Sequence, residues 1–257
     1  MAAPCCPPGS HGPAPPATAA LRGSMVRMGA LSAYVVNAES ATTRAVVCGP
    51  DIFGLDSGSS KAICDRVARD TGHVVVMPDL YEGEPWPEAW GMPTARLNLL
   101  WFVPWLRRHN NDAARRRLYD SVVPYLESRG VESWAWYGFC VGATMCAPLS
   151  ADARCKGGVG CHPSFNALTY AGGPSFERTF GAFKSPLLVI ASANESKDAR
   201  VTAPALVRAA GQSCVVSEYN ENKHGFVNRG DPNDPAVGPE RERAIQEMVA
   251  FLSRVLS

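Results

Sequence analysis

The residue best placed by its neighbours to act as a nucleophile is Cys140, in the stretch Gly138-Phe139-Cys140-Val141-Gly142. The apolar residues before it predict a strand, and those after it predict a helix. A nucleophile on a sharp strand-to-helix turn needs small residues two positions away on each side, because strand and helix pass close together there. Gly138 and Gly142 meet this requirement. The pattern therefore favours a thiol nucleophile over a buried structural cysteine, the other interpretation of such a stretch.

A cysteine nucleophile needs a base, because a free thiol has a pKa of about 8.5 and only its thiolate attacks. The chain has five histidines, and two of them lie where loops are expected at strand ends. His224 is the better candidate, because it lies between the last predicted strand and the last predicted helix. His162 follows an earlier strand, and we expect it to line the pocket and orient its neighbours.

A third group must hold the base in the correct tautomer. The segment from 194 to 201, Asn-Glu-Ser-Lys-Asp-Ala-Arg-Val, follows the next-to-last predicted strand and contains two carboxylates. Glu195 lies nearer the strand end, and Asp198 lies nearer the following helix. The spacing alone does not decide which of the two carboxylates holds the base.

The elements that must position these residues alternate along the chain. Short apolar, β-branched runs predict strands at 33–36, 44–48, 73–77, 133–137, 157–161, 186–191 and 214–219. Helical spacing of apolar residues predicts helices at 61–70, 112–129, 141–149, 203–210 and 240–256. This alternation predicts an α/β fold with a mostly parallel, doubly wound sheet covered by helices on both faces. In such sheets the ligand crevice lies outside the carboxyl ends of the strands, where all the candidate residues fall.

We expect one domain. Residues 1–24 are rich in Ala, Pro, Gly and Ser and lack hydrophobic periodicity, so they predict a disordered tail. Met25 or Met28 could equally be the true start of the chain. Residues 25–257 then form the α/β domain, within which residues 80–110, rich in aromatic residues, Gly and Pro, predict either a lid or a packed connector.

Bulk composition excludes several classes of protein. The 257 residues are 46% hydrophobic and 19% charged, with a net charge of +1, which gives no reason to expect nucleic acid as a partner. No apolar run approaches the roughly 18 to 20 residues that cross a bilayer, so we expect no membrane association. The nine cysteines show neither disulfide nor metal-ligand spacing, which predicts a reducing, cytoplasmic location and no metal or other cofactor. We expect a monomer or a weak homodimer.

Several separated segments together resemble the dienelactone hydrolase (carboxymethylenebutenolidase) family of the α/β-hydrolase superfamily, over about residues 31–256. The segments are Asp51-Ile52-Phe53-Gly54-Leu55, Pro78-Asp79-Leu80-Tyr81 with Gly83-Glu84-Pro85-Trp86, the Cys140 stretch, Cys161-His162-Pro163-Ser164, Asp198-Ala199-Arg200-Val201 and His224-Gly225-Phe226. The resemblance implies a hydrolase that cleaves small ester or enol-lactone molecules through a thioacyl-enzyme intermediate.

The resemblance also implies roles for individual residues. It predicts a triad of Cys140, His224 and Asp198, and so decides for Asp198 over Glu195. The oxyanion of the tetrahedral intermediate would be held by the backbone N–H groups of Ile52 and Val141.

The remaining site residues line the expected pocket. Asp51 stands where the family often has a glutamate that contacts the resting thiol, and is one methylene shorter. Tyr81 and Trp86, like His162, would contact the thiol or line the pocket. Arg229 would pair with a substrate carboxylate.

Two other functions compete with this one. The chain could be an inactive binding or scaffold protein that kept the fold. Alternatively, Cys140 or Cys161 could serve a redox role, forming a sulfenic acid or a disulfide instead of a thioester.

Overall fold

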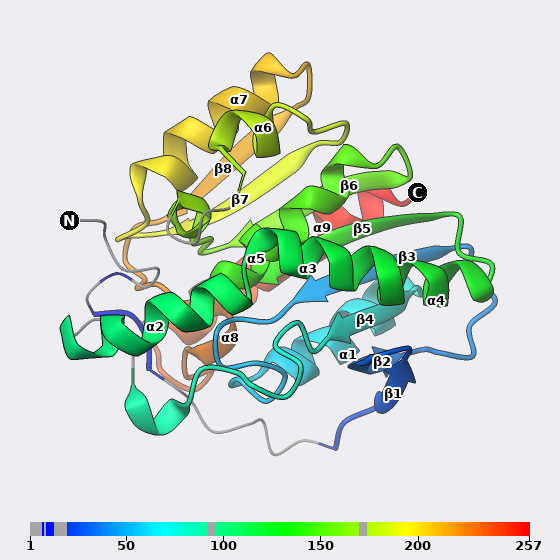
Figure 1. Ribbon diagram of the computed structural model, residues 1–257, viewed down its shortest axis with the longest axis horizontal. Coiled ribbons are helices and arrows are strands. Elements are labelled where there is room, and N and C mark those ends of the chain that lie inside the picture. The colour runs from blue at the N-terminus through cyan, green and yellow to red at the C-terminus, as the bar shows by residue number, and fades with distance from the viewer. Residues whose placement is uncertain (1–6, 8, 13–19, 92–95, 170–173) are drawn as a thin grey trace.

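The computed structural model describes residues 7, 9–12, 20–91, 96–169 and 174–257. Eight strands form one sheet in the order β1-β2-β4-β3-β5-β6-β7-β8 (Figure 1). The strands are β1 (Ser24–Met28), β2 (Leu31–Val36), β3 (Arg44–Gly49), β4 (Val74–Pro78), β5 (Ser133–Phe139), β6 (Cys155–Cys161), β7 (Leu187–Ser192) and β8 (Cys214–Tyr219). Strands β3 to β8 run parallel, while β1 and β2 pair antiparallel at one edge. The predicted mostly parallel sheet is confirmed.

Helices cover both faces of this sheet. The α-helices are α1 (Ser60–Thr71), α2 (Arg96–Arg108), α3 (Asn111–Arg117), α4 (Val123–Ser128), α5 (Val141–Cys146), α6 (Phe176–Phe180), α7 (Ala203–Ala209), α8 (Phe226–Arg229) and α9 (Gly238–Val255). Short 3₁₀ or π turns are η1 (Glu88–Trp90), η2 (Leu118–Val122), η3 (Ala147–Ala151), η4 (Phe165–Thr169) and η5 (Asp198–Thr202). Figure 1 shows α3, α4 and α5 lying across the face of the sheet nearer the viewer.

The alternation of side chains along the strands builds two cores. On β3, Val47 belongs to the core under α3, α4 and α5, while Val46 belongs to the core under α1 and α9. Side chains of successive strand residues point to opposite faces, and both faces of a parallel sheet are covered, so its strands consist of continuous apolar runs. The predicted strands are recognisable for this reason.

The strand register brings the candidate site residues together at the carboxyl ends of the parallel strands. Gly49 of β3 pairs with Gly138 of β5, and Gly138 pairs with Gly160 of β6, so these three strands end at nearly the same level. The loops that follow them therefore emerge side by side, at the edge predicted for the ligand crevice. Asp51, Cys140 and His162 are the first polar or reactive side chains beyond these strand ends.

The structure contains elements that the sequence did not predict, among them the short helices α6 and α8. Ser24–Met28, on the boundary of the predicted tail, forms the edge strand β1. The segment 80–110 contains the helix α2, which spacing alone did not reveal because Pro104 lies inside it.

The tail itself is only partly described. His11 donates a backbone hydrogen bond to His224, and the backbone N–H of Arg22 donates one to Asp65. The prediction of a disordered tail stays a prediction. Residues 1–6, 8 and 13–19 lie outside the described residues.

Candidate active site

Cys140 lies on a strained turn between β5 and α5. Its backbone has φ 55° and ψ −125°, a region that L-residues rarely occupy. A Cβ added at Gly142 would collide with the carbonyl oxygens of Gly49 and Pro50, and one at Gly138 would collide with the first turn of α5. The two glycines therefore let the helix approach β3 and β5 closely enough to hold the thiol at this turn. The Cys140 side chain is fully buried.

Ser164 is a neighbour of the thiol that the sequence analysis did not single out. Its Oγ lies 3.3 Å from the Cys140 Sγ, and its backbone N–H donates to the Cys140 carbonyl over 3.0 Å. Thr144 in turn donates to the Ser164 carbonyl over 2.9 Å. Ser164 could have been predicted as a site residue from its position, because it follows His162-Pro163 directly after the end of β6.

The base and its acid come from the two loops after β7 and β8. His224 Nδ1 donates to a carboxylate oxygen of Glu195 over 2.8 Å, and both side chains are essentially buried, with 0% and 2% exposed. Ser192 donates its hydroxyl to the same carboxylate over 2.6 Å. The backbone N–H of His224 donates to the Asn194 side chain over 3.0 Å. These contacts fix the orientation of the imidazole.

The electrostatics of this group favour a protonated imidazole. Burial alone would lower the pKa of His224, but the Glu195 carboxylate and the Cys140 thiol outweigh it and raise that pKa to about 10. Because Nδ1 is engaged by Glu195, Nε2 is the nitrogen left to exchange a proton with the thiol. The arrangement can support a thiolate–imidazolium pair at neutral pH.

The prediction of Asp198 as the acid is corrected by this geometry. Asp198 begins η5, one turn beyond the loop that carries Glu195, and its side chain hydrogen-bonds to no other described residue. The loop from Ala193 folds back so that the Ala193 N–H donates to Asn222, in the loop that carries His224. This fold brings the residue nearer the strand end, Glu195, to the imidazole.

His162 forms part of the wall behind His224. It is fully buried, its ring lies edge-on to His224 with centroids 4.8 Å apart, and it stacks on Phe139. Burial, followed by the charges of His224 and Arg229, holds the pKa of His162 well below its usual range. A neutral ring at this position keeps a second positive charge away from the catalytic group. That His162 lines the substrate pocket stays a prediction.

The two backbone N–H groups predicted as oxyanion donors lie in the loop after β3 and at the start of α5. The N–H of Val141 is the first of α5, where no helical carbonyl is available to accept it. The N–H of Ile52 donates to no acceptor among the described residues, while its carbonyl accepts from Trp86 over 2.7 Å. Both amides are therefore unpaired within the described chain and lie in the loops that the strand ends bring together.

Asp51 and Arg229, both predicted to lie at the pocket, contact each other. Their side chains form an ion pair with each other, both fully buried. The Asp51 carboxylate also accepts from Asn228, Ser57 and the Phe53 N–H over 2.8–3.0 Å. The contact of Asp51 with the resting thiol stays a prediction. Arg229 also donates through Nε to the His11 carbonyl over 3.0 Å, and its pairing with a substrate carboxylate stays a prediction.

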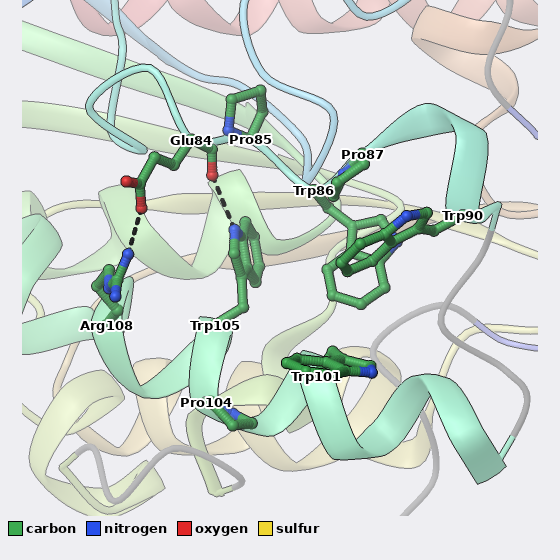
Figure 2. A pocket seen from close by; sticks show the side chains of 9 residues that line it. All are labelled: Glu84, Pro85, Trp86, Pro87, Trp90, Trp101, Pro104, Trp105 and Arg108. Atoms are coloured by element: carbon green, nitrogen blue, oxygen red, sulfur yellow. Dashed lines mark hydrogen bonds and ion pairs between the residues drawn. The ribbon is translucent and has the colours of Figure 1, made fainter.

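Trp86 and Tyr81 belong to an aromatic cluster next to the Ile52 loop. Trp86 lines a pocket of about 380 Å³ together with Trp90, Trp101 and Trp105, and Figure 2 shows these rings around it. Tyr81 lies outside the lining, against Trp105, and donates its hydroxyl to Pro50 over 3.3 Å. Cys140, Glu195 and His224 are not in the lining of this pocket, so the placement of Trp86 and Tyr81 beside the thiol stays a prediction.

Neither a metal centre nor a spanning helix is found in the part of the chain that the structure describes. Its His, Cys, Asp and Glu side chains nowhere gather in a group of three that could hold a metal ion. None of its helices is long and apolar enough to cross a membrane.

Comparison with known families identifies the chain. Residues 31–256 match the dienelactone hydrolase family. The chain belongs to this family. It is therefore a hydrolase of the dienelactone hydrolase type, and the resemblance drawn from the separated segments is confirmed over the range predicted for it.

Individual relatives of this dienelactone hydrolase family member are distant. The carboxymethylenebutenolidase homolog of Mus musculus is 24% identical over 245 residues, covering 90% of this chain and 91% of the relative. The hydrolase pyvD of Aspergillus violaceofuscus is 23% identical, covering 91% of each chain. A dienelactone hydrolase-like promiscuous phosphotriesterase from metagenomic libraries has a similar structure, with a TM-score of 0.61 and 18% identity over 91% of this chain and 99% of that one. These structural similarities support the α/β-hydrolase fold.

The Glu195–His224 contact predicts how the imidazole titrates. In the wild-type protein we expect the ring nuclei of His224 to titrate near pH 10, because the carboxylate stabilises the charged ring. Glu195→Gln removes that charge and should lower the pKa of His224, whereas Asp198→Asn should leave it unchanged. NMR titration of the imidazole, assigned by its loss in His224→Asn, measures both. A pKa that follows Asp198 instead would contradict the observed pairing.

The buried Asp51–Arg229 pair predicts an effect on stability. Removing one partner of a buried ion pair leaves an uncompensated charge, so Arg229→Met should lower the free energy of unfolding by about 3 to 5 kcal/mol. The double variant Asp51→Asn with Arg229→Met should cost less than the sum of the two single changes. Arg108, whose ion pair with Glu84 is exposed, provides the control: Arg108→Met should change stability by less than about 0.5 kcal/mol. Denaturant unfolding measures each value, and additive single changes would argue against the pairing.

Proposed function

We propose that this protein hydrolyses small esters or enol-lactones through a Cys140 nucleophile, with His224 as general acid and base and Glu195 holding the imidazole. The observation that carries the proposal is the buried Cys140 thiol on its strained turn, next to an imidazole that a buried carboxylate keeps charged. A positive charge beside a thiol favours the thiolate, which is the attacking form.

The first half of the reaction is acylation. The Cys140 thiolate forms a bond to the carbonyl carbon, and the carbonyl π electrons move to oxygen. The N–H groups of Ile52 and Val141 would donate to that oxyanion, because both lack acceptors among the described residues. When the carbonyl re-forms, the bond to the alkoxide or enolate oxygen breaks. The leaving oxygen takes the proton from Nε2 of His224, and a thioester remains on Cys140.

The second half is deacylation. His224, now neutral, accepts a proton from a water molecule as the water oxygen bonds to the thioester carbon. Collapse of the second tetrahedral intermediate expels the thiolate and releases the carboxylic acid. Glu195 stays ionised throughout and stabilises the imidazolium that forms in each half.

The substrate class follows from the chemistry of the thiol and from the family. A thiolate is a better leaving group than an amine, so a tetrahedral adduct with an amide proceeds to the thioester less readily than one with an ester. Esters and enol-lactones carry better leaving groups and proceed to the thioester. Several relatives are carboxymethylenebutenolidase homologs, which supports enol-lactones within this class.

The redox alternative receives no support from Cys161. Its thiol points into the core under α9, 3.7 Å from the Met248 sulfur, and burial raises its pKa. A buried thiol of this kind is poorly nucleophilic. Cys161 therefore offers a matched control for Cys140.

Turnover of aryl acetates and of cis- and trans-dienelactones tests the proposal. We expect Cys140→Ala to lower kcat/KM by about 1,000-fold or more, and His224→Ala to do the same, because these groups act as a unit. Cys161→Ala should retain turnover within about threefold. Undiminished turnover by Cys140→Ala would overturn the assignment of the nucleophile.

A further inference from the structure

A short N-terminal segment lies against the loop that carries the catalytic histidine. We name the described residues 7 and 9–12 the strap. The backbone N–H of His11 donates to the His224 carbonyl over 2.8 Å, and the His11 carbonyl accepts from Arg229 Nε over 3.0 Å. The backbone of one residue thus bonds both ends of the segment from His224 to Arg229. The helix α8 of that segment is labelled in Figure 1.

The strap has a defined local structure at this contact. The Ser10 N–H and hydroxyl both donate to the Pro7 carbonyl, over 3.2 and 2.6 Å, which forms a turn directly before His11. The His11 side chain is half-buried. Burial, together with the charges of Arg229 and Lys223, lowers the pKa of His11, so the ring stays neutral beside those cations.

Through Arg229 the strap also reaches the oxyanion-side loop. The same guanidinium that donates to His11 forms the buried ion pair with Asp51, one residue before Ile52. Gly225, with φ 92°, leaves room for that guanidinium to fold back over the loop, because a Cβ there would collide with it. His11, Arg229 and Asp51 therefore form one continuous connection from the strap to both catalytic loops.

We propose that the strap positions His224, and that it does so through the hydrogen bonds of the His11 backbone. The inference rests on the proposed function and adds to it a segment that precedes residues 31–256, the range matched by the family. A catalytic base must be held within a few tenths of an ångström of its productive position, and hydrogen bonds from outside the loop restrict its motion. Without them, His224 would spend less time in the geometry that protonates the leaving group.

Two substitutions at position 11 separate the backbone from the side chain. His11→Pro removes the N–H that donates to His224, whereas His11→Ala keeps it. Loss of one hydrogen bond of ordinary strength predicts a fall in kcat of about 3- to 10-fold for His11→Pro on an aryl acetate, with KM and Tm nearly unchanged. His11→Ala should stay within about twofold of wild type. A fall in Tm with an equal rise in KM would indicate a merely structural role and overturn the proposal.

Other kinetic outcomes would also overturn it. Equal losses in His11→Pro and His11→Ala would assign the effect to the imidazole. Wild-type turnover in His11→Pro would show that the bond is not used. A rise in turnover would show that the strap obstructs the site.

Hydrogen exchange of the full chain tests the strap without any assay of activity. We expect the His11 amide to exchange more slowly than the amides of an unstructured peptide of the same sequence. We expect residues 220–230 to exchange faster in His11→Pro than in His11→Ala. Free exchange at His11 in the wild-type protein would overturn the proposal. Because this readout does not depend on Cys140 chemistry, it distinguishes failure of the strap from failure of the proposed function.

Discussion

The close approach of α5 to β3 at the Cys140 turn is the constraint on which the rest of the site depends. Gly142 must pass the carbonyls of Gly49 and Pro50 at a distance that admits no Cβ. This approach forces Cys140 into its strained backbone conformation and sets the Val141 N–H beside the loop that begins at Pro50. Backbone packing, and not the choice of side-chain rotamers, therefore sets the positions of the thiol and of both candidate oxyanion donors. Strain of this kind persists only where the surrounding structure over-determines it.

Buried charges complete the site in two groups. One is Glu195 with His224, next to the Cys140 thiol, and the other is Asp51 with Arg229. Because an uncompensated charge costs several kcal/mol in such surroundings, each group must be held by hydrogen bonds from more than one element. Ser192 and Asn194 serve the first group, and Ser57 and Asn228 serve the second. The two groups meet in the short segment from His224 to Arg229, which explains why that segment needs Gly225.

The sequence predicted the parts of this account that depend on local pattern. Continuous apolar runs identified the strands, and glycines two positions on either side of Cys140 identified the turn. His224 followed from its place between the last strand and the last helix. The family resemblance favours Asp198 over Glu195, although matching a segment says nothing about which way its loop folds. Only the hydrogen bonds of that loop back to Asn222 and Ser192 bring Glu195 to the imidazole. The contact between Asp51 and Arg229 likewise could not be predicted from the sequence, since the two residues lie 178 positions apart.

The central claim is that Cys140 carries the acyl group during turnover. Intact-protein mass spectrometry after rapid quenching of the wild-type enzyme during turnover of an aryl acetate measures this directly. The account predicts one added acetyl group per chain, mapped by peptide analysis to Cys140 and absent from the Cys140→Ala variant. An acetyl group on another residue, or turnover with no covalent intermediate under conditions that trap one, would contradict it.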